Sequence, residues 1–206
     1  MTPEEFLAAV ETSAGAELER LDSALAADTP AGGFTAESAL RAAARSDAAA
    51  RDRFAAWAEG AVDDVLHDTY VDVAEREAQH YERLLAELPD ESVESTDSGL
   101  DEYLRDVRNP AERLGGGFVG RALVESRALA RLEASFAHHG ESRRADILQD
   151  LRSETEPDVQ RGADLLAEFC RMDDDWERAL DTATRAVVLG VEDWVALGES
   201  DVESRS

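Results

Sequence analysis

Residues 66–88 carry an apolar seam with helical spacing, and this seam constrains the fold more than any other part of the sequence. Its apolar positions are Leu66, Tyr70, Val73, Leu84 and Leu88. The same seam runs through Glu77 and His80, which lie three residues apart. Because an unpartnered carboxylate on a dry helix face costs several kcal/mol, these two side chains need a charge partner, a hydrogen bond or a metal.

The composition predicts an all-α fold. Ala, Leu, Glu and Arg dominate the chain, all of them good helix formers, and extended runs of alternating β-branched residues are absent. The 43% hydrophobic content and the helical periodicity argue against disorder. A chain of 206 residues is long enough for one domain with a substantial core, so we predict a single domain over 1–206.

The charge is strongly acidic, with a formal net value of -26, a pI near 4.3 and no Lys at all. Such a surface argues against binding to nucleic-acid phosphates. An acidic, Lys-free, Ala-rich surface resembles that of halophilic proteins, in which salt screens self-repulsion. We find neither a signal peptide nor a span of apolar residues long enough for a membrane, so we expect a cytoplasmic protein. The lone Cys170 excludes an internal disulfide and is expected to be a buried structural thiol.

Helix start and stop signals predict six helices. Their expected ranges are 3–27, 35–59, 61–88, 111–139, 142–171 and 174–197. Pro157 should kink or restart the fifth helix. Residues 28–33 should be a loop, and the tail 198–206 should be frayed.

The linker 89–110 is rich in loop-forming residues, with a short helical turn over 100–107. Roughly 20 residues can extend over about 65 Å, more than the ~40 Å length of a helix of about 27 residues. The linker can therefore cross the full length of a bundle, as in ferritin-like folds. We predict a four-helix bundle over 34–172 with accessory helices at 3–27 and 174–197, which could cover the bundle or mediate homodimerisation.

Three further acids occupy seam positions: Asp47 on the second helix, Glu125 on the fourth and Glu154 on the fifth. Asp47 and Glu77 flank the turn near Gly60, while Glu125 and Glu154 flank the turn near Gly140. Residues about equidistant from such turns lie at the same height in antiparallel hairpins. Docked face to face, the hairpins would bring these acids and His80 into one interior layer. This oxygen-rich set suits iron or manganese better than zinc.

Two stretches carry a resemblance to a known family. Residues 46–54, Ser-Asp-Ala-Ala-Ala-Arg-Asp-Arg-Phe, and residues 72–84, Asp-Val-Ala-Glu-Arg-Glu-Ala-Gln-His-Tyr-Glu-Arg-Leu, resemble the first half of rubrerythrin and other ferritin-like proteins. The resemblance implies a four-helix bundle with a non-haem di-iron site for peroxide reduction or iron oxidation, supplied by an external electron donor. It implies Asp47 in place of the first-helix Glu, Glu77 as bridging ligand and His80 as terminal ligand. Glu125 and Glu154 take the third- and fourth-helix positions.

The chain departs from that family at three places. Pro157 stands where rubrerythrin has its second His, Asp47 is one methylene shorter than Glu, and one Cys cannot build a rubredoxin-like module. We therefore expect no haem, no iron–sulfur cluster and no rubredoxin centre, and a ferritin-type asymmetric site with one His.

Other interpretations of the same residues remain open. Asp47 could pair with Arg51, Glu125 could pair with Arg121, and His80 could be a satisfied core histidine. A bundle that has lost its metal could serve as an interaction or regulatory protein. A scaffold that binds a small ligand in the bundle core is a third hypothesis.

Overall fold

The computed structural model of the protein describes residues 1–26, 35–89, 93 and 98–203, and these residues contain helices and turns but no strand. The elements are α1 Pro3–Ala24, α2 Ala36–Glu59, α3 Asp64–Leu85, α4 Gly99–Arg105, α5 Pro110–Arg113, the π-helix η2 Leu114–Gly120, α6 Arg121–His138, α7 Ser142–Thr155, α8 Pro157–Phe169 and α9 Asp173–Glu203. The all-α prediction is confirmed. Among the described helices, none is both long and apolar enough to cross a membrane.

Side-chain caps define where several helices begin. Thr2 and Glu5 form a reciprocal capping box at the start of α1, and Thr35 and Ser38 do the same for α2. The Asp63 side chain accepts hydrogen bonds from two backbone N–H groups at the start of α3. These caps fix the residue at which each helix begins, and the spacing of apolar residues then places the seam on the side that faces the core.

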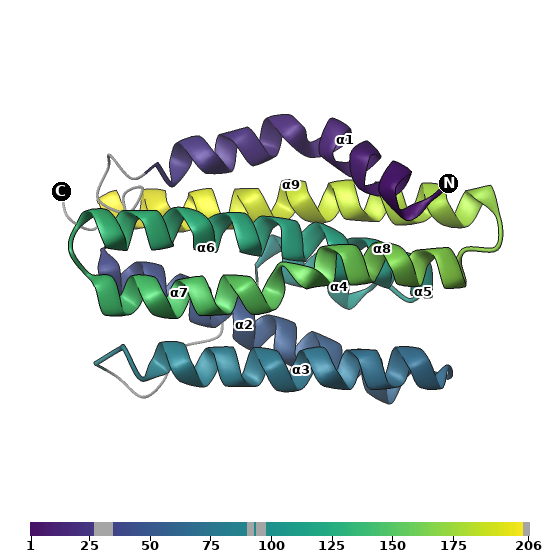
Figure 1. Ribbon diagram of the computed structural model, residues 1–206, viewed down its shortest axis with the longest axis horizontal. Coiled ribbons are helices and arrows are strands. Elements are labelled where there is room, and N and C mark those ends of the chain that lie inside the picture. Colours follow the sequence, from purple (N-terminus) through teal and green to yellow (C-terminus); the bar gives the residue numbers. More distant parts are fainter. Residues whose placement is uncertain (27–34, 90–92, 94–97, 204–206) are drawn as a thin grey trace.

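The long helices run back and forth as antiparallel neighbours (Figure 1). The α2–α3 pair forms one hairpin, and α6 with the α7–α8 segment forms the other. The long helix α9 packs against η2, and α1 covers α9, α8 and α6. Between the hairpins, α4 and α5 pack on α9. The candidate functional residues lie where the α2–α3 hairpin faces the second hairpin.

The glycine-rich π-helix η2 brings the start of the second hairpin unusually close to its neighbours. A Cβ at Gly115 would lie 2.2 Å from the backbone oxygen of Ala179 on α9, and one at Gly117 would lie 2.5 Å from the Trp57 ring. We expected this glycine run to weaken the helix; the structure instead gives it a packing role.

Most predicted helix boundaries are close to the observed ones. The break at Pro157 is confirmed, because α7 ends at Thr155 and α8 begins at Pro157. The predicted fourth helix is divided into α5, η2 and α6, and α9 continues to Glu203, beyond the expected end at 197. The predicted loop 28–33, most of linker segment 90–97 and tail residues 204–206 lie outside the described residues. Cys170 is a free, half-buried thiol, and burial raises its pKa to about 11.

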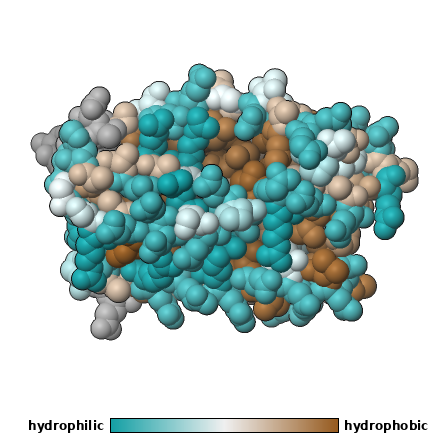
Figure 2. All heavy atoms as spheres, viewed as in Figure 1, coloured by the Kyte–Doolittle hydropathy of each residue, from teal (hydrophilic) through white to brown (hydrophobic). Residues whose placement is uncertain are grey.

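The surface seen in Figure 2 is mostly hydrophilic, with smaller hydrophobic areas between the polar side chains. This agrees with the formal net charge of -26. In contrast to this solvated charge, a group of ionisable residues is buried inside the molecule.

Candidate metal centre

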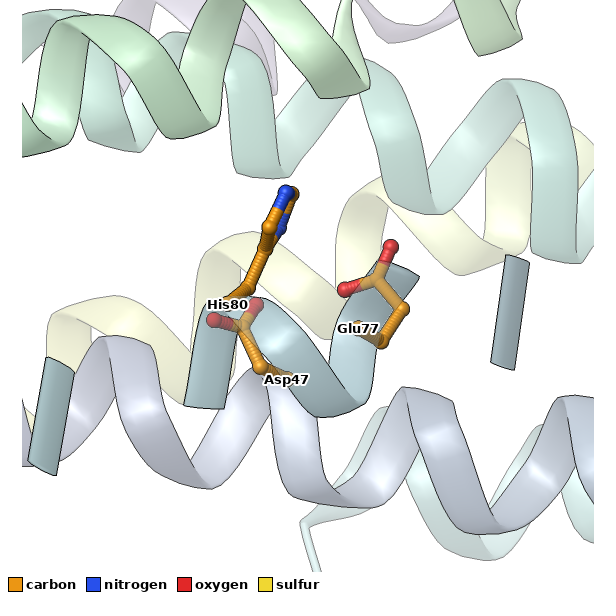
Figure 3. Close-up of side chains that lie close together, drawn as sticks. All are labelled: Asp47, Glu77 and His80. Carbon is orange, nitrogen blue, oxygen red and sulfur yellow. The ribbon is translucent and has the colours of Figure 1, made fainter. Parts of the chain in front are cut away.

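Asp47, Glu77 and His80 form a compact buried group. Asp47 comes from the middle of α2, and Glu77 and His80 come from consecutive turns of α3 (Figure 3). Their exposed fractions are 2%, 0% and 1%. Each offers one potential ligand atom, and these atoms all lie within 4.8 Å of one another. Two carboxylates and one imidazole at this spacing are a suitable partial ligand set for a divalent transition metal.

Glu77 is also an ion-pair partner for two arginines. Its Oε1 accepts a 2.6 Å hydrogen bond from Nη2 of Arg121 and a 3.2 Å hydrogen bond from Nη2 of Arg76. Its Oε2 is buried and has no hydrogen-bond partner among the described residues. One oxygen of this carboxylate is therefore neutralised by guanidinium groups, while the other is available to a further cationic or protonated group.

Glu125 lies beside the group of three but is not part of it. Ser46 Oγ donates a 2.6 Å hydrogen bond to Oε2 of Glu125. Its Oε1, like Oε2 of Glu77, is buried without a partner in the described part of the chain. Buried carboxylate oxygens are normally hydrogen-bonded, so two unpartnered ones in one layer are suited to contact a cation or to share a proton.

Glu154 lies at the solvent edge of the layer, with its side chain 41% exposed. Its Oε2 is 2.9 Å from Nε2 of His80, and its Oε1 accepts a 2.9 Å hydrogen bond from Arg83. When neutral His80 donates from Nε2 to Glu154, the lone pair resides on Nδ1. Glu154 is thus placed to orient the imidazole.

The electrostatics of the layer show an excess of buried negative charge. Burial, followed by the charges of Glu77 and Glu125, raises the pKa of Asp47 well above its usual range. Burial also raises the pKa of Glu125 to about 7. Burial alone would raise the pKa of Glu77, but Arg121 and Arg76 outweigh it and lower that pKa. The pKa of His80 is lowered, chiefly by burial.

Both local pairings considered from the sequence differ from what the structure shows. Arg51 pairs with Asp52 at 2.8 Å and leaves Asp47 buried in the layer. Arg121 lies one turn before Glu125, but its hydrogen bond goes to Glu77 on another helix. The nearby charge of Arg121 still lowers the pKa of Glu125, although burial has the larger effect.

The available ligands fit one metal ion better than two. Asp158 is the next acid along the α7–α8 segment, and it accepts hydrogen bonds from the Arg76 guanidinium through both oxygens. Glu154 is shared between His80 and Arg83. The buried Arg121 supplies the positive charge that a second cation would otherwise provide. Among the described acids of the layer, only Asp47, Glu77 and Glu125 retain carboxylate oxygens that no arginine holds.

Local sequence patterns only partly indicate the residues that complete the layer. The spacing makes Arg121 a candidate partner of Glu125. The contacts of Arg121 and Arg76 with Glu77, and of Ser46 with Glu125, were not predicted. Only the hydroxyl side chain of Ser46 and its position next to Asp47 hinted that it would contact the carboxylate layer.

The chain matches no protein-family model, no curated protein and no solved structure. The chemistry of the site therefore has to be inferred from its own residues.

Proposed function

We propose that the protein is a ferritin-like helical bundle that binds one divalent transition-metal ion, iron(II) or manganese(II), in the buried layer. Asp47, Glu77 and His80 are the proposed primary ligands, and Glu125 adds a further oxygen. The observation that carries this proposal is the pair of unpartnered buried oxygens, Oε2 of Glu77 and Oε1 of Glu125, beside an imidazole. The two antiparallel hairpins and the rubrerythrin-like stretches support the fold assignment.

The surrounding residues prepare the layer for a cation. Arg121 and Arg76 keep Glu77 ionised, and Glu154 fixes the orientation of His80. The raised pKa values of Asp47 and Glu125 support this proposal, because a bound cation would stabilise the ionised form of both acids. A bound cation would replace protons on these acids, so its affinity should rise with pH.

Bound iron would supply redox chemistry toward peroxide or oxygen, with electrons from an external donor. The chain itself contributes a buried site beside the Arg121 guanidinium, which holds Glu77 in its ionised form. A manganese ion at the same ligands would favour a storage or structural role.

One observation favours a second function. The 2.6 Å contact between Arg121 and Glu77 puts a guanidinium where a second cation would lie in a two-metal site. In this alternative the layer holds no metal, Asp47 and Glu125 are protonated, and the bundle acts as a non-catalytic interaction or regulatory protein.

Metal binding by stripped protein distinguishes the two functions. The chelator-treated chain is titrated anaerobically with iron(II) and separately with manganese(II), and bound metal is counted after equilibrium dialysis. We expect one ion per chain for the wild type and for Asp52→Asn, whose acid lies on α2 with its side chain 71% exposed. Asp47→Asn should bind none. Absence of bound metal in the wild type would favour the metal-free function, and equal, non-zero metal content in the wild type and Asp47→Asn would place the metal at another site.

A further inference from the structure

A cavity of about 220 Å³ lies between α2, α4, α6 and α9, next to the carboxylate layer. Its apolar wall is formed by Ala42, Leu100, Val124, Trp194 and Leu197. An apolar cavity of roughly 150 Å³ is large enough for benzene, so this one can hold a small organic molecule.

Two buried arginines line the polar side of the cavity. Arg53 is 8% exposed and Arg121 is 2% exposed. Nη1 of Arg53, and Nε and Nη1 of Arg121, donate no hydrogen bond to any described residue. A buried guanidinium that leaves donors unused carries a desolvation cost, which an anionic ligand would relieve.

The positive charge on this side of the cavity is only partly compensated. Arg53 pairs with Asp101, yet burial, followed by the charge of Arg121, lowers the pKa of Arg53 to about 9. In a chain with a formal net charge of -26, two guanidinium groups that each keep unused donors beside one cavity stand apart from the general surface.

We propose that this cavity binds a small organic monoanion, with a carboxylate head between Arg53 and Arg121 and an apolar body against the wall containing Trp194. A bidentate carboxylate matches the planar donors of a guanidinium.

The acids of the cavity limit the ligand to a single negative charge. Asp101 is paired with Arg53, and Asp193 accepts hydrogen bonds of 2.9 and 3.0 Å from the backbone N–H groups of Gly99 and Leu100. Glu125 is held by Ser46. These carboxylates leave the arginine donors free but repel a dianion such as phosphate.

The site shares Arg121 and Glu125 with the carboxylate layer but does not require a metal. The ligand would therefore bind beside the proposed metal centre, either as a substrate of that centre or as a separate regulator. Binding to metal-stripped protein tests the cavity independently of the proposed function.

The test uses calorimetric titration in the presence of chelator with benzoate, its neutral isostere benzamide, hexanoate and inorganic phosphate. We expect one benzoate or hexanoate per chain, with benzoate binding at least ten-fold tighter than benzamide and phosphate. Arg53→Gln should weaken benzoate binding at least ten-fold. Arg161→Gln, which removes a surface arginine paired with Asp72, is the matched control and should leave it unchanged.

A second variant separates loss of the ligand site from loss of the fold. Ala42→Phe fills the cavity while both arginines remain, and it should abolish binding with an unchanged circular-dichroism spectrum. Asp47→Asn should still bind benzoate, because that change affects the metal ligands only. Three results would overturn the proposal. Neither benzoate nor hexanoate binds, or benzoate and benzamide bind equally, or benzoate binding survives both Arg53→Gln and Ala42→Phe.

Discussion

Two neighbouring layers of the interior are built from the same helices and have opposite chemistry. The aromatic layer consists of Phe54, Trp57, Tyr70 and Phe118, and the carboxylate layer consists of Asp47, Glu77, His80, Arg121 and Glu125. On each of the three contributing helical segments an aromatic residue and an acid lie two turns apart. These pairs are Phe54 with Asp47, Tyr70 with Glu77, and Phe118 with Glu125.

The aromatic layer is held together by ring contacts, and the Tyr70 hydroxyl within it is buried without a hydrogen-bond partner among the described residues. Phe54 makes edge-to-face contacts with Trp57 at 5.2 Å and with Phe118 at 5.1 Å between ring centroids, and Tyr70 packs on all three rings. Such pairs contribute about 0.5–1.5 kcal/mol each beyond burial. The carboxylate layer, in contrast, buries unpartnered carboxylate oxygens and carboxyls with raised pKa values. A stretch of core that costs stability, two turns away from well-packed rings, supports the proposed metal binding.

The largest effect is expected from the aromatic layer. Phe54→Ala leaves a cavity among three rings and should lower the free energy of unfolding by about 3–5 kcal/mol. Urea denaturation measures this loss. The folded variant should still bind one metal ion per chain, since none of the ligands changes. A loss of metal together with an intact fold would mean that the two layers are not independent.

Removal of the buried guanidinium should have the next largest effect. Arg121→Met leaves Glu77 with Arg76 alone, so the metal-free variant should lose about 3 kcal/mol of unfolding free energy, as for a broken buried ion pair. Arg51→Met, which removes a partly exposed cation on α2 that pairs with Asp52, should change it by less than about 0.5 kcal/mol. Manganese(II) should restore more stability to Arg121→Met than to the wild type. Equal loss in the two variants would show that the Arg121–Glu77 pair contributes nothing.

The pH dependence of the free energy of unfolding should reveal the excess negative charge in the carboxylate layer. Glu125 has a folded pKa of about 7, above its unfolded value, so the folded state binds the extra proton and metal-free stability should fall as pH rises from 5 to 7. Comparison with Glu125→Gln isolates this group, and the wild type should lose about 2 kcal/mol more than the variant over that interval. Denaturation at pH 5, 6, 7 and 8 measures the difference. Parallel curves would place Glu125 outside the charged layer.

The smallest stability change is expected at the edge of the carboxylate layer. Glu154→Gln affects an exposed side chain and should alter unfolding free energy by less than about 0.5 kcal/mol. Because Glu154 orients His80, metal affinity should fall by about ten-fold. Calorimetric titration with manganese(II) measures this effect, for which Asp150→Asn, one turn earlier on α7, is the control. An affinity equal to that of the control would remove Glu154 from the site.

The sequence allowed prediction of features that depend on helix phase within one segment. The burial of Glu77 and His80 and the break at Pro157 both follow from local spacing. Glu154 was expected on the interior seam, but in the structure Leu151, Thr155 and Asp158 are buried and Glu154 is exposed. The buried stripe runs through Leu151, Thr155 and Asp158 at helical spacing and continues across the break at Pro157, and Glu154 lies one position outside it.

Contacts between helices could not be predicted from local spacing in this way. Arg121 and Glu77 are 44 residues apart, and no local pattern selects that partner over Glu125, one turn along the same helix. The π-helix η2, immediately before Arg121, also changes the phase of the segment in a manner that ordinary helical periodicity does not predict. The cavity beside Trp194 depends on four separate helices and was therefore outside what local patterns specify.

The central claim, that the carboxylate layer sacrifices stability for metal binding, is tested most directly by the unfolding free energy of Asp47→Asn with and without manganese(II). Without metal, the variant should be about 1–2 kcal/mol more stable than the wild type, because a neutral amide avoids the cost of ionising or protonating a buried carboxyl at neutral pH. With manganese(II) at about 100-fold over its dissociation constant, the wild type should gain about 3 kcal/mol and the variant nothing. A wild type that manganese(II) fails to stabilise, or a variant that gains as much, would contradict the claim.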